Sequence, residues 1–285
     1  MSSMIYNVAI VVAAVFALSL TSCKKDKVFN TPHPDQGALV VMADFSRRSE
    51  SCPVPQEYAL AVGGEESSTV STGQSFCHPD LFLPGNYMLT AYSAGDKMTT
   101  EGGNIRIDTL SASIIDAMPG YLFAVRQEIT VIQDDTLHVR LPMTQRTRDL
   151  HFELTVTEGD PERIAGITGR LDGVLGVFDL ATQCPLTDRF AVEPDFARSG
   201  DKVTADARLL GVAGSGLTFT LDLAFTDGRT QHIENDLTEL LAAFNADDMS
   251  VPLTVRGNLL TPISAGFMAT VTDWEVGEKE NVEIN

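Results

Sequence analysis

The chain has 285 residues, and its 39 Asp and Glu residues outnumber its 20 Lys and Arg residues, giving a net charge of -19. Nucleic acid and anionic lipid both require a basic surface, so this charge excludes nucleic-acid binding and electrostatic attachment to a membrane. The length suffices for two domains of ordinary size, and self-repulsion that favours solubility explains the acidity without any partner.

The N-terminus begins with an apolar run, residues 8–20, that closes with small residues and a cysteine, Thr21-Ser22-Cys23. This pattern is typical of a signal peptide, and the run is too short to span a bilayer, which takes roughly 20 apolar residues. The end of the run also resembles a bacterial lipobox, in which cleavage exposes the cysteine and its thiol is diacylated. We therefore expect residues 1–22 to be removed and Cys23 to be the lipidated first residue. The alternative is an ordinary secretory signal with a chance cysteine, and residues 1–7 lack the positive charge expected at its start.

Residues 23–36 are polar and contain Pro32 and Pro34 without any periodic apolar pattern. Such a composition predicts a tether that holds a folded body away from the membrane.

Residues 37–143 consist of short apolar or alternating runs separated by turn residues. Strands are predicted at 38–45, 57–62, 86–92, 121–133 and 136–141. Short strands at this spacing, without helical periodicity, predict a β-sandwich.

A second β pattern fills residues 144–285, after a charged connection, 142–149, that we expect to join two domains. Strands are predicted at 151–157, 169–180, 217–225, 229–233, 251–255 and 266–274. The glycines of 169–180 predict bulges or a close backbone approach, and Asp227-Gly228 predicts a hairpin turn. Apolar residues at helical spacing predict one short helix over 236–245, capped by Asn235 or Asp236, and residues 161–164 one helical turn.

Three cysteines follow Cys23. In an exported protein we expect Cys52 and Cys77 to form a disulfide, with two separate buried thiols as the alternative, and Cys184 to be a small buried residue. No metal-ligand spacing or nucleophile elbow occurs, and the glycine-rich segment 211–216 lacks the Lys of a phosphate loop. Carboxylates are too numerous for a glycosidase pair to be singled out. We therefore expect no enzymatic activity, cofactor or metal.

Four segments carry a resemblance: 83–92, 142–150, 167–180 and 269–274. With the lipobox and two β-rich halves, they resemble the fimbrillin-type (type V) pilus anchor and accessory subunits. This resemblance implies an all-β fold of two transthyretin-like β-sandwiches in tandem, display at the cell surface and no enzymatic activity. It also implies pilin partners, joined when a β-strand of one subunit enters the sheet of another.

The sequence thus predicts a lipoprotein of the outer membrane that anchors or accompanies a fimbrium. The alternative is a surface lipoprotein that binds glycan, with a ligand on a host or bacterial surface as its partner. Glycan platforms need exposed aromatic rings, whereas the only tryptophan, Trp274, lies in an alternating strand and is expected in the core. The tail 275–285 is a candidate donor strand, and a frayed terminus is the alternative.

Overall fold

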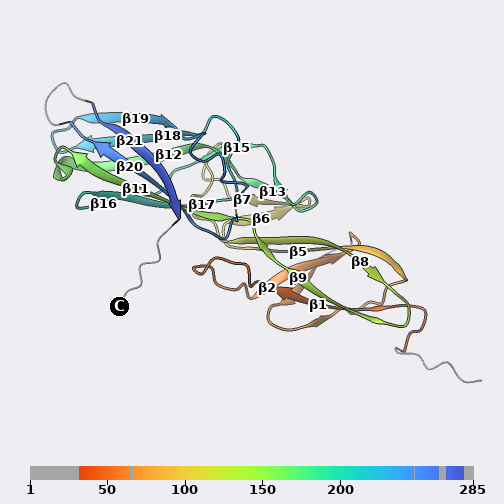
Figure 1. Ribbon diagram of the computed structural model, residues 1–285. Helices are drawn as coiled ribbons and strands as arrows, with labels where there is room; N and C mark the ends of the chain where they lie inside the picture. Colours follow the sequence, from red (N-terminus) through yellow and green to blue (C-terminus); the bar gives the residue numbers. More distant parts are fainter. Residues whose placement is uncertain (1–31, 65–66, 247, 263–267, 279–285) are drawn as a thin grey trace, which may run out of the picture.

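The computed structural model describes residues 32–64, 67–246, 248–262 and 268–278. Two β-rich bodies lie end to end and form an elongated molecule (Figure 1). Each body encloses a hydrophobic core between sheets, so the predicted all-β fold of tandem β-sandwiches is confirmed.

The first body places a three-stranded sheet, ordered β4-β1-β9, opposite a five-stranded sheet, ordered β10-β8-β5-β2-β3. Its strands are β1 (Ala38–Asp44), β2 (Glu57–Val62), β3 (Ser68–Ser71), β4 (Phe76–Cys77), β5 (Gly85–Ala94), β8 (Leu122–Val131), β9 (Thr136–Pro142) and β10 (Thr144–Gln145). Alternation decides which side chains enter the core, as in β1, where Leu39 and Val41 are buried.

The second body places a five-stranded sheet, ordered β16-β17-β11-β20-β21, opposite a four-stranded sheet, ordered β15-β12-β18-β19. Its strands are β11 (Arg148–Glu158), β12 (Ile164–Leu175), β15 (Arg189–Val192), β16 (Ala197–Ser199), β17 (Lys202–Leu209), β18 (Thr218–Phe225), β19 (Thr230–Asp236), β20 (Leu253–Leu260) and β21 (Thr270–Glu278). The expected inward face of 151–157 is confirmed, because Phe152, Leu154 and Val156 are buried.

The turn chemistry of the second body follows the sequence. Gly228 has a φ of 83° in the turn that joins β18 to β19. Gly173 has a φ of 86° where the register of β12 shifts against β15, so the bulge expected among these glycines is present.

A fifth sheet joins the two halves of the chain. The hairpin β6 (Met98–Glu101) and β7 (Asn104–Ile107) pairs through β7 with β13 (Val177–Asp179), which pairs with β14 (Cys184–Pro185). Ile105 and Ile107 belong to the core of the second body although they precede β8 in the chain. The division at 143/144 stays a prediction, and the hairpin shows that the two halves of the sequence share structure.

The expected helix over 236–245 is wrong. Among the described residues the only helix is the 3-10 turn η1 (Pro161–Arg163), and residues 238–246 form successive turns. The predicted apolar face is nevertheless buried, since Leu237, Leu241 and Phe244 are each 1% exposed. A segment this short gains little from helix formation. Instead, the Asn245 side chain holds its end by bonding both backbone groups of Val212, at 2.9 Å and 2.7 Å.

Candidate functional site

The segment expected to connect the two domains, 142–149, forms a largely buried joint. Arg148 is 2% exposed and donates from Nε to the carbonyl oxygen of Val251 at 2.6 Å and from Nη1 to that of Phe244 at 3.2 Å. Gln145, also 2% exposed, donates from Nε2 to the carbonyl oxygen of Met249 at 3.1 Å. The Gln145 bond fixes the end of the first body to the loop before β20, and the Arg148 bonds hold the start of β11 against the same loop.

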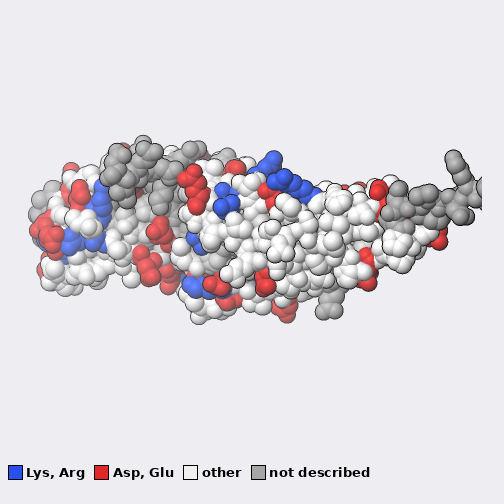
Figure 2. All heavy atoms as spheres, turned by 90° about the horizontal axis from the view of Figure 1, so that it is seen from below, with Lys and Arg blue, Asp and Glu red and all other residues white. Residues whose placement is uncertain are grey.

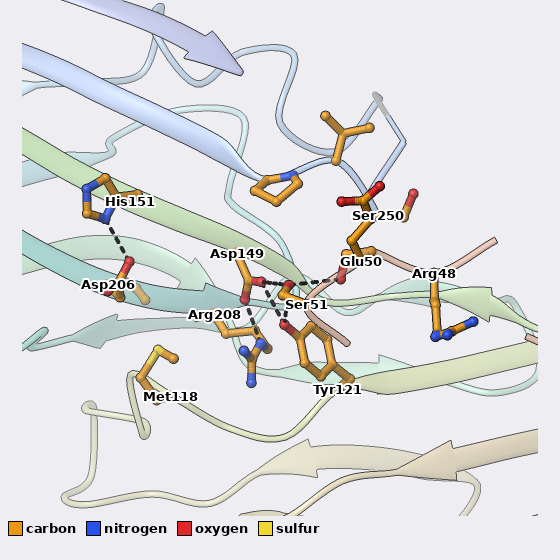
Figure 3. A pocket seen from close by; sticks show the side chains of 14 residues that line it. Arg48, Glu50, Ser51, Met118, Tyr121, Asp149, His151, Asp206, Arg208 and Ser250 are labelled. Atoms are coloured by element: carbon orange, nitrogen blue, oxygen red, sulfur yellow. Dashed lines mark hydrogen bonds and ion pairs between the residues drawn. The ribbon is translucent and has the colours of Figure 1, made fainter. Parts of the chain in front are cut away.

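A cavity of about 620 Å³, here named the junction cavity, opens beside this joint (Figure 3). Its lining comes from the loop after β1, the segment before β8, the start of β11, the end of β17 and the loop before β20. Most of the side chains labelled in Figure 3 are polar or charged. The cavity therefore offers hydrogen-bonding and charged groups to a ligand or to water.

Asp149 is the centre of the hydrogen bonding in the junction cavity. Its Oδ2 accepts from the Tyr121 hydroxyl at 2.7 Å, and its Oδ1 accepts from Arg208 Nε at 2.7 Å. The Arg208 guanidinium carbon lies 3.6 Å from the centre of the Tyr121 ring. Burial raises the pKa of Tyr121, and the carboxylate beside it adds to that shift while the hydrogen bond from Ser51 opposes it. The phenol thus stays protonated and remains a donor to Asp149.

The cavity does not contain the parts of a hydrolytic centre. His151 is held by Asp206, with Nδ1 and Oδ1 2.7 Å apart, and the Tyr121 and Ser51 hydroxyls both face Asp149. No cluster of His, Cys, Asp or Glu among the residues that the structure describes is placed to hold a metal ion. The arrangement orders a joint and offers hydrogen bonds.

Open sheet edges are the second feature of functional interest. In the described part of the chain, β9 pairs only with β1, and β21 pairs only with β20. Unpaired backbone groups along such edges can accept a strand from another chain. Trp274 on β21 is half-buried, lies edge-on to Phe219 and donates from Nε1 to Asn235 at 2.8 Å, so its ring packs on the core as expected.

The predicted site residues lie apart from the junction cavity or outside the described chain. Cys23 precedes the described residues. Cys52 and Cys77 are free thiols, the first buried and the second exposed. Cys77 pairs with Val40 near the start of β1, whereas Cys52 follows the end of β1. Their disulfide stays a prediction that non-reducing peptide mapping tests.

Cys184 corrects an expectation, because it is exposed on the short strand β14 and not buried. The tail is also partly corrected, since residues through Glu278 already pair with β20, and 279–285 lie outside the described residues. Sequence reasoning missed Arg148, Asp149 and Arg208. Arg148 and Asp149 belong to the charged segment 142–149, a pattern that normally marks solvent-exposed chain, and Arg208 had no distinguishing signal in the sequence.

The surface is consistent with the exclusions drawn from composition. On the face shown in Figure 2, basic side chains lie in small separate groups among acidic ones. Within the described ranges, none of the helical segments has the length and apolar character needed to traverse a bilayer.

The fold defines the chain as a tandem β-sandwich protein with open sheet edges, and comparison with known proteins specifies the family. The model of the fimbrillin-A associated anchor proteins Mfa1 and Mfa2 matches residues 60–279, and the chain belongs to this family. Membership implies a fimbrial role at the cell surface. No curated protein matches the chain.

Solved structures share the fold at low sequence identity. The fimbrial anchor protein Mfa2 from Porphyromonas gingivalis is 12% identical, with 85% of this chain and 97% of that chain covered and a TM-score of 0.57. A candidate adhesin from Bacteroides ovatus is 10% identical, with 87% and 96% covered and a TM-score of 0.61. A candidate polysaccharide-binding protein from Bacteroides thetaiotaomicron is 12% identical, with 86% and 98% covered and a TM-score of 0.54.

Proposed function

We propose that the protein is a lipid-anchored structural subunit of a fimbrial assembly, held in the outer membrane through Cys23 and joined to pilins by β-strand complementation. Membership in the anchor family carries the proposal. The position of the tether supports it, because the described chain begins at the end of the first body that points away from the second (Figure 1). A lipid at Cys23 would leave the second body free to meet other subunits.

Labelling with a fatty acid tests the anchor. The wild-type protein takes up labelled palmitate and partitions with the outer membrane, whereas Cys23→Ala gives an uncleaved or soluble form without label. Cys77→Ser is the matched control, because this exposed thiol lies in the folded body and its loss leaves labelling unchanged. A Cys23→Ala variant that still takes up the label would refute lipidation at this residue.

A truncation tests the strand exchange. Removal of residues 279–285 leaves β21 paired with β20 through Glu278, so the second body retains its sheet. The truncated protein stays folded and membrane-bound but no longer retains pilin in a pull-down, because the missing segment supplies the donor strand. Normal retention of pilin by the truncated protein would show that the tail is only a terminus.

Glycan binding is the second candidate function, and the charged and polar side chains that line part of the junction cavity favour it. Carboxylates and guanidinium groups suit the hydroxyls of a sugar, although Arg208 covers one face of the Tyr121 ring that a sugar would stack on. A glycan array tests this function, with Asp206→Ala as the variant that removes a cavity carboxylate. If the Asp206→Ala variant still binds, the glycan site lies outside the junction cavity. If the array gives no signal, the structural role remains as the one proposed function.

A further inference from the structure

Two strands of the first body, β1 and β9, are parallel neighbours, and the chain enters the body at the start of β1 and leaves it after the end of β9. Their register is continuous, from Ala38 opposite Thr136 to Asp44 opposite Pro142. Backbone bonds extend the pair at both ends, because Ala38 N donates to Asp135 O at 2.9 Å and Met143 N donates to Asp44 O at 2.9 Å. The ladder therefore continues without interruption from the tether to the joint.

The chain enters this pair at one end and leaves at the other. The tether reaches β1 at Gly37, beside Phe82, where the two residues exchange backbone bonds of 2.9 Å. β9 ends at Pro142 and continues directly into the joint, where Gln145 of the first body binds Met249 of the second. Tension between the tether and the second body therefore pulls the start of β1 and the end of β9 in opposite directions, and the connections from β5 to β6 and from β7 to β8 share the load on the side of the second body.

Strands pulled in this way slide past each other, so the hydrogen bonds between them are loaded together. Strands pulled apart from one end lose the same bonds one after another, which takes less force. We propose that the β1–β9 pair is a force clamp that bears the tension transmitted from the fimbrium to the membrane anchor. This function rests on the proposed anchoring role, since only a tethered subunit carries such a load.

Side chains reinforce the clamp against sliding. Leu39 and Val41 on β1, and Val139 and Leu141 on β9, are buried in the first core and would have to move through it. On the outer side Arg140 Nε binds the Asp44 carboxylate at 2.8 Å across the two strands. A shift by one residue would turn each buried side chain toward solvent, so the register resists small displacements as well as complete rupture.

The direction of each backbone group in β1 identifies the bonds that carry the load. Leu39 O accepts from His78 N, so the odd positions of β1 face β4. Ala38 and Asp44 bond on the side of β9, and alternation along the strand places the N–H of Met42 on that same side. Proline at 42 removes a bond of the clamp, whereas proline at 43 removes an N–H that points away from β9.

Single-molecule force spectroscopy on the purified mature chain tests the proposal through two pulling geometries. In the first geometry the handles are attached at His33, before β1, and at Asp201, in the turn between β16 and β17 of the second body, so that the force acts along β1 and β9. Handles at His33 and Gln133 load the same strands from one end only. We expect a several-fold lower unfolding force in the second geometry, and equal forces in both would overturn the clamp. The gain in contour length identifies which body has opened.

Two variants test the bonds themselves. Under constant axial load Met42→Pro unfolds the first body roughly five- to tenfold faster, as expected for the loss of one backbone hydrogen bond. Ala43→Pro is the matched control and leaves the rate unchanged once both variants are compared at equal equilibrium stability. Identical rates for the two variants would place the resistance outside the β1–β9 pair. Lipid and pilin are absent from these measurements, so their outcome is independent of the anchoring proposal.

Discussion

Replacement of Arg148 by alanine should destabilise the second body more than any surface substitution. The guanidinium is buried, bonds the carbonyl oxygens of Val251 and Phe244, and lies 5.4 Å from the centre of the Phe244 ring. Hydrogen bonds to a charged group contribute about 1.5–3 kcal/mol each, and the alanine variant leaves two buried carbonyl groups unpaired. We therefore expect a loss of about 3–5 kcal/mol in the free energy of unfolding.

Urea denaturation followed by the fluorescence of Trp274 measures this loss, because the only tryptophan packs on the second core. With an m value of about 2 kcal/mol/M, the midpoint should fall by about 1.5–2.5 M. Arg148→Lys keeps the charge but reaches one carbonyl at most, so its urea midpoint should lie between those of the wild-type protein and Arg148→Ala. Arg229→Ala is the control, since this exposed residue pairs with Asp227 at the surface and its loss should cost less than about 1 kcal/mol. A midpoint for Arg148→Ala that matches the Arg229→Ala midpoint would refute the role of the buried joint.

In the reduced protein Cys77 should react with a maleimide at once and Cys52 only on unfolding, because burial raises the pKa of the Cys52 thiol to about 11; rapid labelling of Cys52 would contradict its burial. The hydrogen bond to Asp222 raises the pKa of His232 above the ordinary value of 6.5, so the pair stabilises the fold at low pH, and this contribution is lost as the pH rises through the folded-state pKa. An NMR titration should show the raised pKa, and Asp222→Asn should lower it. Gly120→Ala should lower the midpoint of thermal unfolding by several degrees, since the added Cβ would lie 2.5 Å from the backbone nitrogen of Asp96 and the Cα of Gly95. An unchanged midpoint would show that the backbone at Gly95 and Gly120 moves apart at little cost.

Alternation and turn residues made most of the fold predictable, because they depend on neighbours within a few positions. The inward face of β11 and the turn at Gly228 follow from such local patterns. The hairpin β6–β7 was not predictable, since its partner β13 lies far along the chain and periodicity shows which face is buried but not what covers it. The burial of Arg148 was missed for the same reason, because its carbonyl partners come from a distant loop.

The false helix over 236–245 shows the limit of periodicity in another way. The apolar spacing correctly identified the buried side chains, but a chain of successive turns can present the same spacing. The side chain of Asn245 binds both backbone groups of Val212 and holds the end of these turns in place. A contact of this kind has no signature in the local sequence.

The strand β8 has a consequence for how the protein is made. Its first residues are buried on both faces, with Leu122 and Ala124 in the second core and Phe123 and Val125 in the first. During synthesis the N-terminal half of the chain emerges before the residues that will cover Leu122, Ala124 and the β6–β7 hairpin. These apolar groups stay exposed to water until residues 150–260 follow, so the nascent chain offers a binding surface to holdase chaperones throughout that interval. Folding is therefore completed only with the second half of the polypeptide, and a stall between the halves would favour aggregation and degradation.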